Sequence, residues 1–173
     1  MNGAVTNADA QILLHELGHL FDAMMRDDSV EEGFIRLAQD GSDETEVLYA
    51  SETDGGVEDA VVACVFGFCA GNPDLAAKLL LRPVQAVSTF EGIVATDAPD
   101  LHAATFCASQ QDIDTLRASS PIDINLWLSA LALGVMITKA QSYPVRMAAL
   151  LSEYRRAGLL RVSRADVLSL IPS

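Results

Sequence analysis

Residues 11–25 read QILLHELGHLFDAMM, and this stretch decides both the expected fold and the expected chemistry of the chain. Its apolar side chains recur at the spacing of one helix face: Ile12, Leu13, Leu17, Leu20, Phe21 and Met24. Asn7 is a favourable N-cap, so we expect a helix that begins after Asn7 and continues through Met25. Because positions i and i+4 share a face, His15 and His19 should direct their imidazoles to the same side.

His15, Glu16 and His19 form the pattern HExxH, which zinc peptidases carry on a helix. Two imidazoles one turn apart can bind a single tetrahedral Zn²⁺ ion. Glu16 would lie beside the open coordination position, where a carboxylate can take a proton from zinc-bound water. We therefore predict a zinc site with His15 and His19 as ligands and Glu16 as general base. The alternative is an amphipathic helix with two core histidines, since so short a pattern also occurs by chance.

A catalytic zinc site needs a third protein ligand, with one position left for water. The acids that begin the next predicted helix, in TDGGVEDAVVACVFGF (residues 53–68), are suitable donors. A helix packed against the first would hold such a ligand rigidly. Glu58 is the preferred ligand and Asp59 is its rival. His102, the one histidine outside the motif, is a third candidate but is remote in sequence. The alternative is that Glu58 and Asp59 bind no metal and only complement the dipole at the start of their helix.

Two more residues of the first helix carry expectations. Gly18 costs about 1 kcal/mol relative to alanine in an exposed helix, so it predicts close approach by another element. Asp22 follows His19 by three residues on the same face, where it could accept the outer ring N–H of a ligand histidine. Its alternative role is that of a solvated helix carboxylate.

The blocks HELGHLFD (residues 15–22) and LYASETDGGVEDAVVACVFGFCAGNPDLAAKLLLRPVQAVSTF (residues 48–90) resemble the metallopeptidase domain family of the anthrax lethal factor type, a group of zincins. In that family a tyrosine and then a glutamate-led, alanine-rich helix follow the histidine motif. The resemblance covers about residues 8–90. It implies Zn²⁺ as cofactor, a protein or peptide substrate, Glu58 as third ligand, and Tyr49 as hydrogen-bond donor to the tetrahedral oxyanion.

Two other zincin groups share parts of the pattern. The regulator-cleaving ImmA/IrrE peptidases also resemble the chain in HELGH followed by a glutamate-led helix, and they imply the same ligands. Residues 56–59 partly match the Gly-x-x-Asp arrangement of aspartate-type zincins, which keeps Asp59 as the alternative to Glu58.

Glycine and proline breaks divide the rest of the chain into further helices, expected at residues 57–70, 74–81, 84–95, 101–118, 121–143, 145–157 and 164–171. Ser120 and Ser163 are expected as N-caps, and Gly158 as a left-handed stop. Between the first two helices we expect an irregular connector, with a helical turn around Phe34 and an extended segment at residues 47–49.

The expected fold is mainly α: a compact helical single domain over residues 1–173, with a zincin-like active-site helix and little or no β-sheet. Residues 1–95 would form the metallopeptidase-like part and residues 96–173 a helical C-terminal part. Half of the residues are hydrophobic, which is enough to bury a real core. Residues 147–171 resemble a helix-turn-helix with arginines, but a plain helical hairpin is preferred at this net charge.

Composition excludes some partners. A net charge of −13 argues against nucleic acid, because phosphate binding depends on clustered Lys and Arg. Between Asp27 and Asp59 every charged residue except Arg36 is acidic, which would favour basic peptide segments. The three cysteines lack CxxC spacing, so neither a disulfide framework nor a cysteine zinc site is expected.

The first residues contain neither a positive n-region nor an apolar h-region, so no secretory signal is visible. The longest apolar run, which begins at Leu126, is too short to cross a bilayer. We therefore expect a cytoplasmic protein without membrane contact.

The sequence as a whole predicts a zinc metallopeptidase in which activated water hydrolyses peptide bonds. Two alternatives stay open. One is a zincin-derived binding or structural domain that keeps zinc without turnover. The other is a metal-free helical module for protein interaction.

Overall fold

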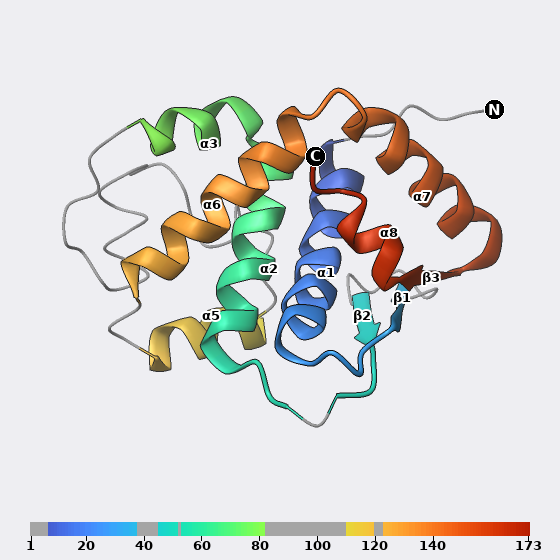
Figure 1. The fold of residues 1–173 in the computed structure, drawn as a ribbon, viewed down its shortest axis with the longest axis horizontal. Coiled ribbons are helices and arrows are strands. Elements are labelled where there is room, and N and C mark those ends of the chain that lie inside the picture. Colours follow the sequence, from blue (N-terminus) through green and yellow to red (C-terminus); the bar gives the residue numbers. More distant parts are fainter. Residues whose placement is uncertain (1–6, 38–44, 52, 82–109, 120–122) are drawn as a thin grey trace.

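The computed structural model describes residues 7–37, 45–51, 53–81, 110–119 and 123–173, and over these residues the fold is mainly helical (Figure 1). Its elements are α1 (Asn7–Arg26), β1 (Glu32–Leu37), β2 (Thr45–Leu48), α2 (Gly56–Gly71), α3 (Pro73–Leu80), α5 (Gln110–Ala118), α6 (Ile124–Lys139), α7 (Tyr143–Ala157), β3 (Leu159–Ser163) and α8 (Arg164–Leu168). The prediction of a compact, mainly α fold with little sheet is confirmed.

Helices α1 and α2 lie side by side at the centre of the molecule and run antiparallel (Figure 1). Their backbones meet at Gly18, where an added Cβ would lie 2.7 Å from the Cα of Ala63. Only a hydrogen fits there, so the close approach predicted from Gly18 is confirmed. The contact fixes the first turns of α2 beside the histidine motif of α1.

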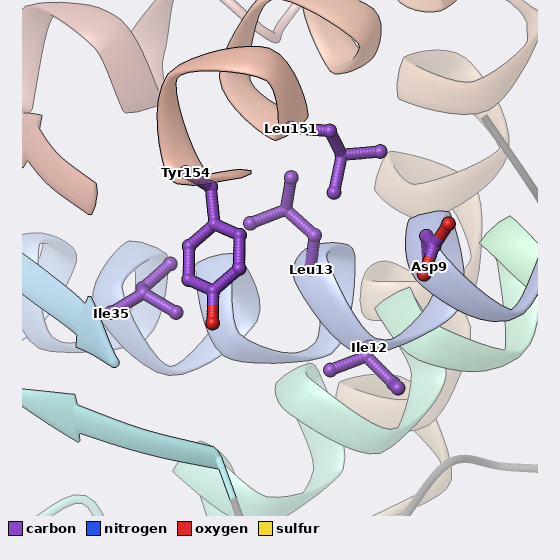
Figure 2. A pocket seen from close by; sticks show the side chains of 6 residues that line it. All are labelled: Asp9, Ile12, Leu13, Ile35, Leu151 and Tyr154. Carbon is purple, nitrogen blue, oxygen red and sulfur yellow. The ribbon is translucent and has the colours of Figure 1, made fainter. Parts of the chain in front are cut away.

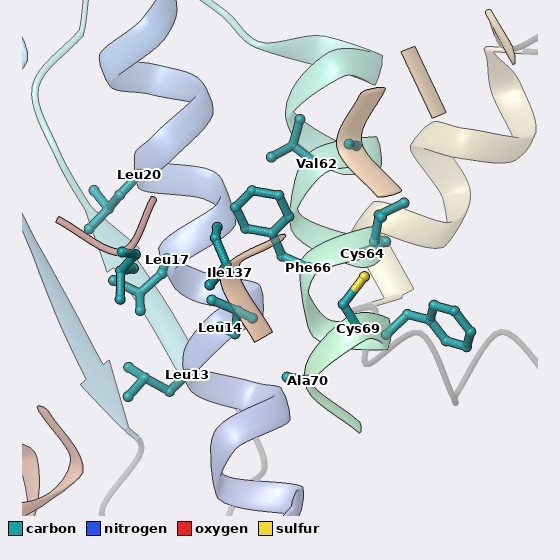
Figure 3. Close-up of a cluster of buried hydrophobic side chains, with 14 of the residues drawn as sticks. Leu13, Leu14, Leu17, Leu20, Val62, Cys64, Phe66, Cys69, Ala70 and Ile137 are labelled. Carbon is teal, nitrogen blue, oxygen red and sulfur yellow. The ribbon is translucent and has the colours of Figure 1, made fainter. Parts of the chain in front are cut away.

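The core fills the space around this helix pair (Figure 3). Leu14 of α1 lies on the side of α2, near Phe66 of α2 and Ile137 of α6. Leu13 and Leu20 point to the opposite side of α1, where Leu20 meets Gly33 of β1 and Leu13 lies near Ile35. Helix α2 is buried on every side from Ala60 to Ala70, because α1, α5 and α6 all pack against it. A helix that is apolar all round belongs inside a protein core, and each large side chain buried there contributes about 1.5–3 kcal/mol.

A small antiparallel sheet lies beside α1, in the order β2-β1-β3. Ile35 of β1 pairs with Val47 of β2 on one side and with Leu160 of β3 on the other. Strand β3 thus joins the C-terminal part of the chain to the hairpin that follows α1. The extended segment predicted at residues 47–49 is confirmed by β2.

Two predictions in this region are wrong. The helical turn expected around Phe34 is strand β1, because burial alternates there: Gly33 and Ile35 face inward while Arg36 is exposed. Neither a helical hairpin nor a helix-turn-helix covers residues 147–171, since β3 separates α7 from α8. Burial alternates along β3 as well, with Leu160 and Val162 inside.

Helix ends agree with the sequence at several points. Gly158 ends α7 in the left-handed region, with φ of 68°. Ser163 begins α8 in a capping box with Asp166. The start of α6 differs from the prediction: it begins at Ile124 with Asp123 as N-cap, so Pro121 is not its first residue. The Asp123 side chain accepts from the N–H of Asn125, which supplies the capping acceptor locally.

Some sequence expectations fall outside the described residues. The helix expected at residues 84–95 lies wholly there, and of residues 101–118 only α5 is described. Among the described helices, none is by itself long and apolar enough to cross a membrane. Helices α2 and α3 pass that test only together, as a pair bent by 118°.

Candidate metal centre

His15 and His19 point to the same side of α1, as one helical turn dictates. Their Nε2 atoms lie 3.2 Å apart, and their rings meet edge to face with centroids 4.9 Å apart. His15 is only 3% exposed, whereas His19 is half-buried. Two ring nitrogens that converge in this way can both bind a single metal ion.

Asp112, in the first turn of α5, brings a carboxylate to the same point. Its Oδ2 lies 3.2 Å from Nε2 of His15 and 3.7 Å from Nε2 of His19. The residue is 8% exposed. Among the described residues, His15, His19 and Asp112 are a group that could hold a metal ion, with one ligand atom from each lying within 4.8 Å of the others.

The spacing of this group fits a metal ion. Ligands at about 2.0–2.2 Å from a tetrahedral zinc are separated from one another by roughly 3.3–3.5 Å. The three separations here, 3.2, 3.2 and 3.7 Å, lie around that value. Three protein ligands would leave a fourth position open. The donor set does not by itself select the metal, because two histidines and a carboxylate also suit iron(II).

The charges around His19 favour a cation at this centre. Asp59 Oδ2 accepts a hydrogen bond from Nδ1 of His19 at 2.8 Å, while Asp112 lies on the Nε2 side. Burial lowers the pKa of His19, but hydrogen bonds to Asp112 and Asp59 outweigh it and raise the pKa to about 10. A proton on His19 or a metal ion can supply the positive charge that two carboxylates demand.

The pKa of Asp112 is shifted in the opposite direction to that of His19. Burial raises the pKa of its carboxyl group, but hydrogen bonds from His15 and His19 outweigh burial and hold that pKa below its usual range. The carboxylate is therefore ionised at neutral pH, in the form that binds metals.

The predicted site residues fall into two groups. His15 and His19 come together as expected. Glu16 follows His15 on α1 and is buried, with 6% exposed. Glu58 is exposed on the first turn of α2 and does not belong to the cluster of ligand atoms. Its neighbour Asp59 contacts the outer nitrogen of His19 instead of the cluster.

Tyr49 is half-buried just after β2. Burial and the negative charge of Asp59 raise the pKa of its hydroxyl, against the opposing effect of Arg26. Tyr49 therefore interacts with the charges of Asp59 and Arg26. His102 lies outside the described residues.

Sequence reasoning missed Asp112. It lies in QQDIDTLRA, a polar helix that carries no metal-binding motif. Nothing in its spacing connects it with His15 or His19, which precede it by more than ninety positions. Only the packing of α5 against α2 brings it to the histidines.

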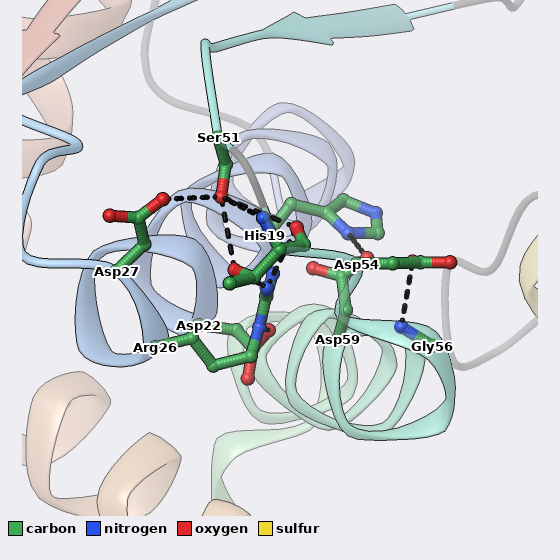
Figure 4. A network of polar contacts seen from close by, with 9 residues as sticks. His19, Asp22, Arg26, Asp27, Ser51, Asp54, Gly56 and Asp59 are labelled. Carbon is green, nitrogen blue, oxygen red and sulfur yellow. Dashed lines mark hydrogen bonds and ion pairs between the residues drawn. The ribbon is translucent and has the colours of Figure 1, made fainter.

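A second network lies next to His19, at the C-terminal end of α1 (Figure 4). Arg26 donates from Nε to Asp22 at 2.7 Å and from Nη1 to the carbonyl of Thr53 at 3.0 Å. The prediction that Asp22 accepts from a ligand histidine is wrong, because Arg26 engages Asp22 and Asp59 takes that place. The network also attaches the segment before α2 to α1.

Two hollows lie away from the metal ligands. A cavity of about 40 Å³ is lined by Asp9, Ile12, Leu13, Ile35, Leu151 and Tyr154 (Figure 2). Ligand pockets usually measure about 300–1,000 Å³, so this cavity is too small for a substrate. An open groove is lined by Phe34, Val47, Leu48, Tyr49 and Ala50.

Comparisons with protein-family models, with curated protein sequences and with solved structures gave no match.

Proposed function

We propose that the chain is a zinc-dependent metallopeptidase in which His15, His19 and Asp112 hold the ion. One observation carries the proposal. The two histidines of the HExxH helix and Asp112 of α5 bring three donor atoms together, at separations of 3.2, 3.2 and 3.7 Å. Asp112 takes the role that the sequence assigned to Glu58, because its oxygen reaches both histidines while Glu58 is exposed.

Zn²⁺ bound there would supply a Lewis acid for a peptide carbonyl. Glu16, which is adjacent to His15 in sequence and buried, would accept a proton from the attacking water and pass it to the leaving amine. Tyr49 is the proposed hydrogen-bond donor to the oxyanion. The groove that Tyr49 lines with β2 offers an apolar surface for a peptide, and the net charge of −13 favours a basic one.

The test combines metal analysis with peptide hydrolysis on matched variants. Wild type should contain about one zinc per chain, and His15→Ala and Asp112→Asn should lose it. Glu16→Gln should keep zinc while its kcat for a basic peptide falls by about 10²–10⁴-fold, the usual contribution of a general base. Glu58→Gln is the control, and it should keep both zinc and activity because Glu58 is exposed.

Two results would overturn the proposal. One is purified wild type without zinc that also fails to take it up when zinc is added. The other is equal zinc content in wild type and His15→Ala, which would show that His15 is not a ligand.

A zinc-binding domain without turnover is the second candidate. It is favoured by burial, since His15 and Glu16 are 3% and 6% exposed and so lie largely out of reach of water. It predicts the same zinc content and the same loss in His15→Ala, with no hydrolysis in any variant. A metal-free interaction module predicts neither zinc nor hydrolysis, with a proton on His19 in place of the ion.

A further inference from the structure

We propose that Asp59 is a positioning residue of the metal centre, which holds His19 in the tautomer and ring orientation that metal binding requires. The inference rests on the metal site of the proposed function and does not depend on peptide hydrolysis. It starts from the contact between Oδ2 of Asp59 and Nδ1 of His19, at 2.8 Å.

A neutral imidazole carries its proton on one of two nitrogens, and the lone pair of the other binds metal. A hydrogen bond from Nδ1–H to Asp59 keeps the proton on Nδ1. The lone pair then lies on Nε2, the atom that faces His15 at 3.2 Å and Asp112 at 3.7 Å. A carboxylate behind a ligand histidine also makes that histidine more basic toward the metal.

The fold holds Asp59 rigidly in this place. Asp59 lies in the first turn of α2, and its N–H donates to the carbonyl of Gly55. One turn further along α2, the backbone at Ala63 touches Gly18, the residue that precedes His19. The two helices therefore cannot slide past each other without breaking the pair between Asp59 and His19.

Arg26 acts on Asp59 through its charge. Arg26 donates from Nε to Asp22 and from Nη1 to Thr53, whereas its Nη2 and Oδ1 of Asp59 are both buried with no hydrogen-bond partner in the described part of the chain. His19 is thus the residue that forms a hydrogen bond with this carboxylate in the described part of the chain. A carboxylate kept at a helix start only for the dipole would gain by facing water instead.

The two ligand histidines differ in this respect. Nδ1 of His15 is buried and has no hydrogen-bond partner among the described residues, whereas Nδ1 of His19 has Asp59. Within the described residues, a carboxylate therefore orients His19 from behind its ring, whereas His15 has no such partner on its outer nitrogen. Loss of Asp59 should act through His19 and leave His15 unchanged.

Zinc affinity tests the inference directly. Wild type, Asp59→Ala, Asp59→Asn and Glu58→Gln would be stripped with a chelator and titrated with Zn²⁺ against a chromophoric chelator. The Kd of Asp59→Ala should rise by about 10–100-fold, the usual cost of losing such a partner. The Kd of Asp59→Asn should rise less, because its amide oxygen can still accept a hydrogen bond from Nδ1–H of His19.

Glu58→Gln is the matched control, since it also removes one negative charge from the first turn of α2. Its Kd should change by less than about threefold, because an exposed carboxylate acts only through screened electrostatics. Nitrogen NMR of the zinc-loaded proteins gives a second readout. Wild type should show the His19 proton on Nδ1 with zinc on Nε2, and Asp59→Ala should lose this single pattern.

Each other outcome overturns the inference in a recognisable way. Wild type that binds no zinc overturns the proposed function and this inference together. Wild type that binds zinc, with an unchanged Kd in Asp59→Ala, overturns this inference alone. Equal weakening in Asp59→Ala and Glu58→Gln would point to a general field effect. Total loss of zinc from the isosteric Asp59→Asn would make Asp59 a ligand, not a positioning residue.

Discussion

The charge of His19 predicts how the metal-free protein responds to pH. Burial lowers its pKa, but Asp112 and Asp59 outweigh burial and raise the folded-state value to about 10, above 6.5 for an ordinary histidine. A raised folded-state pKa stabilises the fold fully below pH 6.5, and this stabilisation is lost as the pH rises toward about 10.

With chelator present, the free energy of unfolding in urea should therefore be higher at pH 6 than at pH 9. His19→Gln should flatten this difference, because glutamine does not titrate. An unfolding free energy that stays constant or increases over this range in wild type would contradict the assigned pairing. Saturating zinc should also weaken the dependence, since the ion replaces the proton.

At the scale of single elements, the contact between α1 and α2 gives a prediction whose sign is not obvious. Gly18→Ala should gain about 1 kcal/mol from helix propensity. Its new Cβ, however, would lie 2.7 Å from the Cα of Ala63, a backbone atom that cannot move alone. Overpacking of this kind usually costs about 1–3 kcal/mol, so we expect a net loss of stability.

Thermal or urea unfolding of Gly18→Ala measures the balance. The zinc Kd should increase as well, because separation of the helices draws Asp59 away from His19. A variant more stable than wild type would show that the helices separate freely at this point.

The elements that the sequence predicts best are those whose information is local. The apolar spacing of α1 and the i to i+4 relation of His15 and His19 lie within a single helix, so both follow from the sequence. The alternation that defines β1 spans few residues, and its partner β3 lies more than 120 positions away. The contacts of Asp112 with His15 and His19 also join residues far apart in the sequence. Its role depends on how α5 packs, which no spacing rule contains.

At the scale of the whole molecule, Arg164 joins the C-terminal part of the chain to the end of α1 and the loop after it. Its guanidinium donates to the carbonyls of Met24 at 2.7 Å, Asp27 at 2.9 Å and Val30 at 2.8 Å. The last carbonyls of a helix lack partners within it, so Arg164 satisfies the end of α1 from the start of α8. Sheet pairing of β3 with β1 acts beside it to hold the same regions together.

Arg164→Ala should therefore lower the free energy of unfolding by about 2–3 kcal/mol, because three carbonyls lose charged donors. Arg161→Ala is the matched control on β3: its exposed side chain pairs with Glu32, and such surface pairs contribute about 0–1 kcal/mol. Urea unfolding of both variants gives the comparison. Equal losses would mean that α1 and α8 are held by apolar packing alone, whereas a larger loss in Arg164→Ala would show that one side chain joins the helix carrying HExxH to the C-terminal part of the fold.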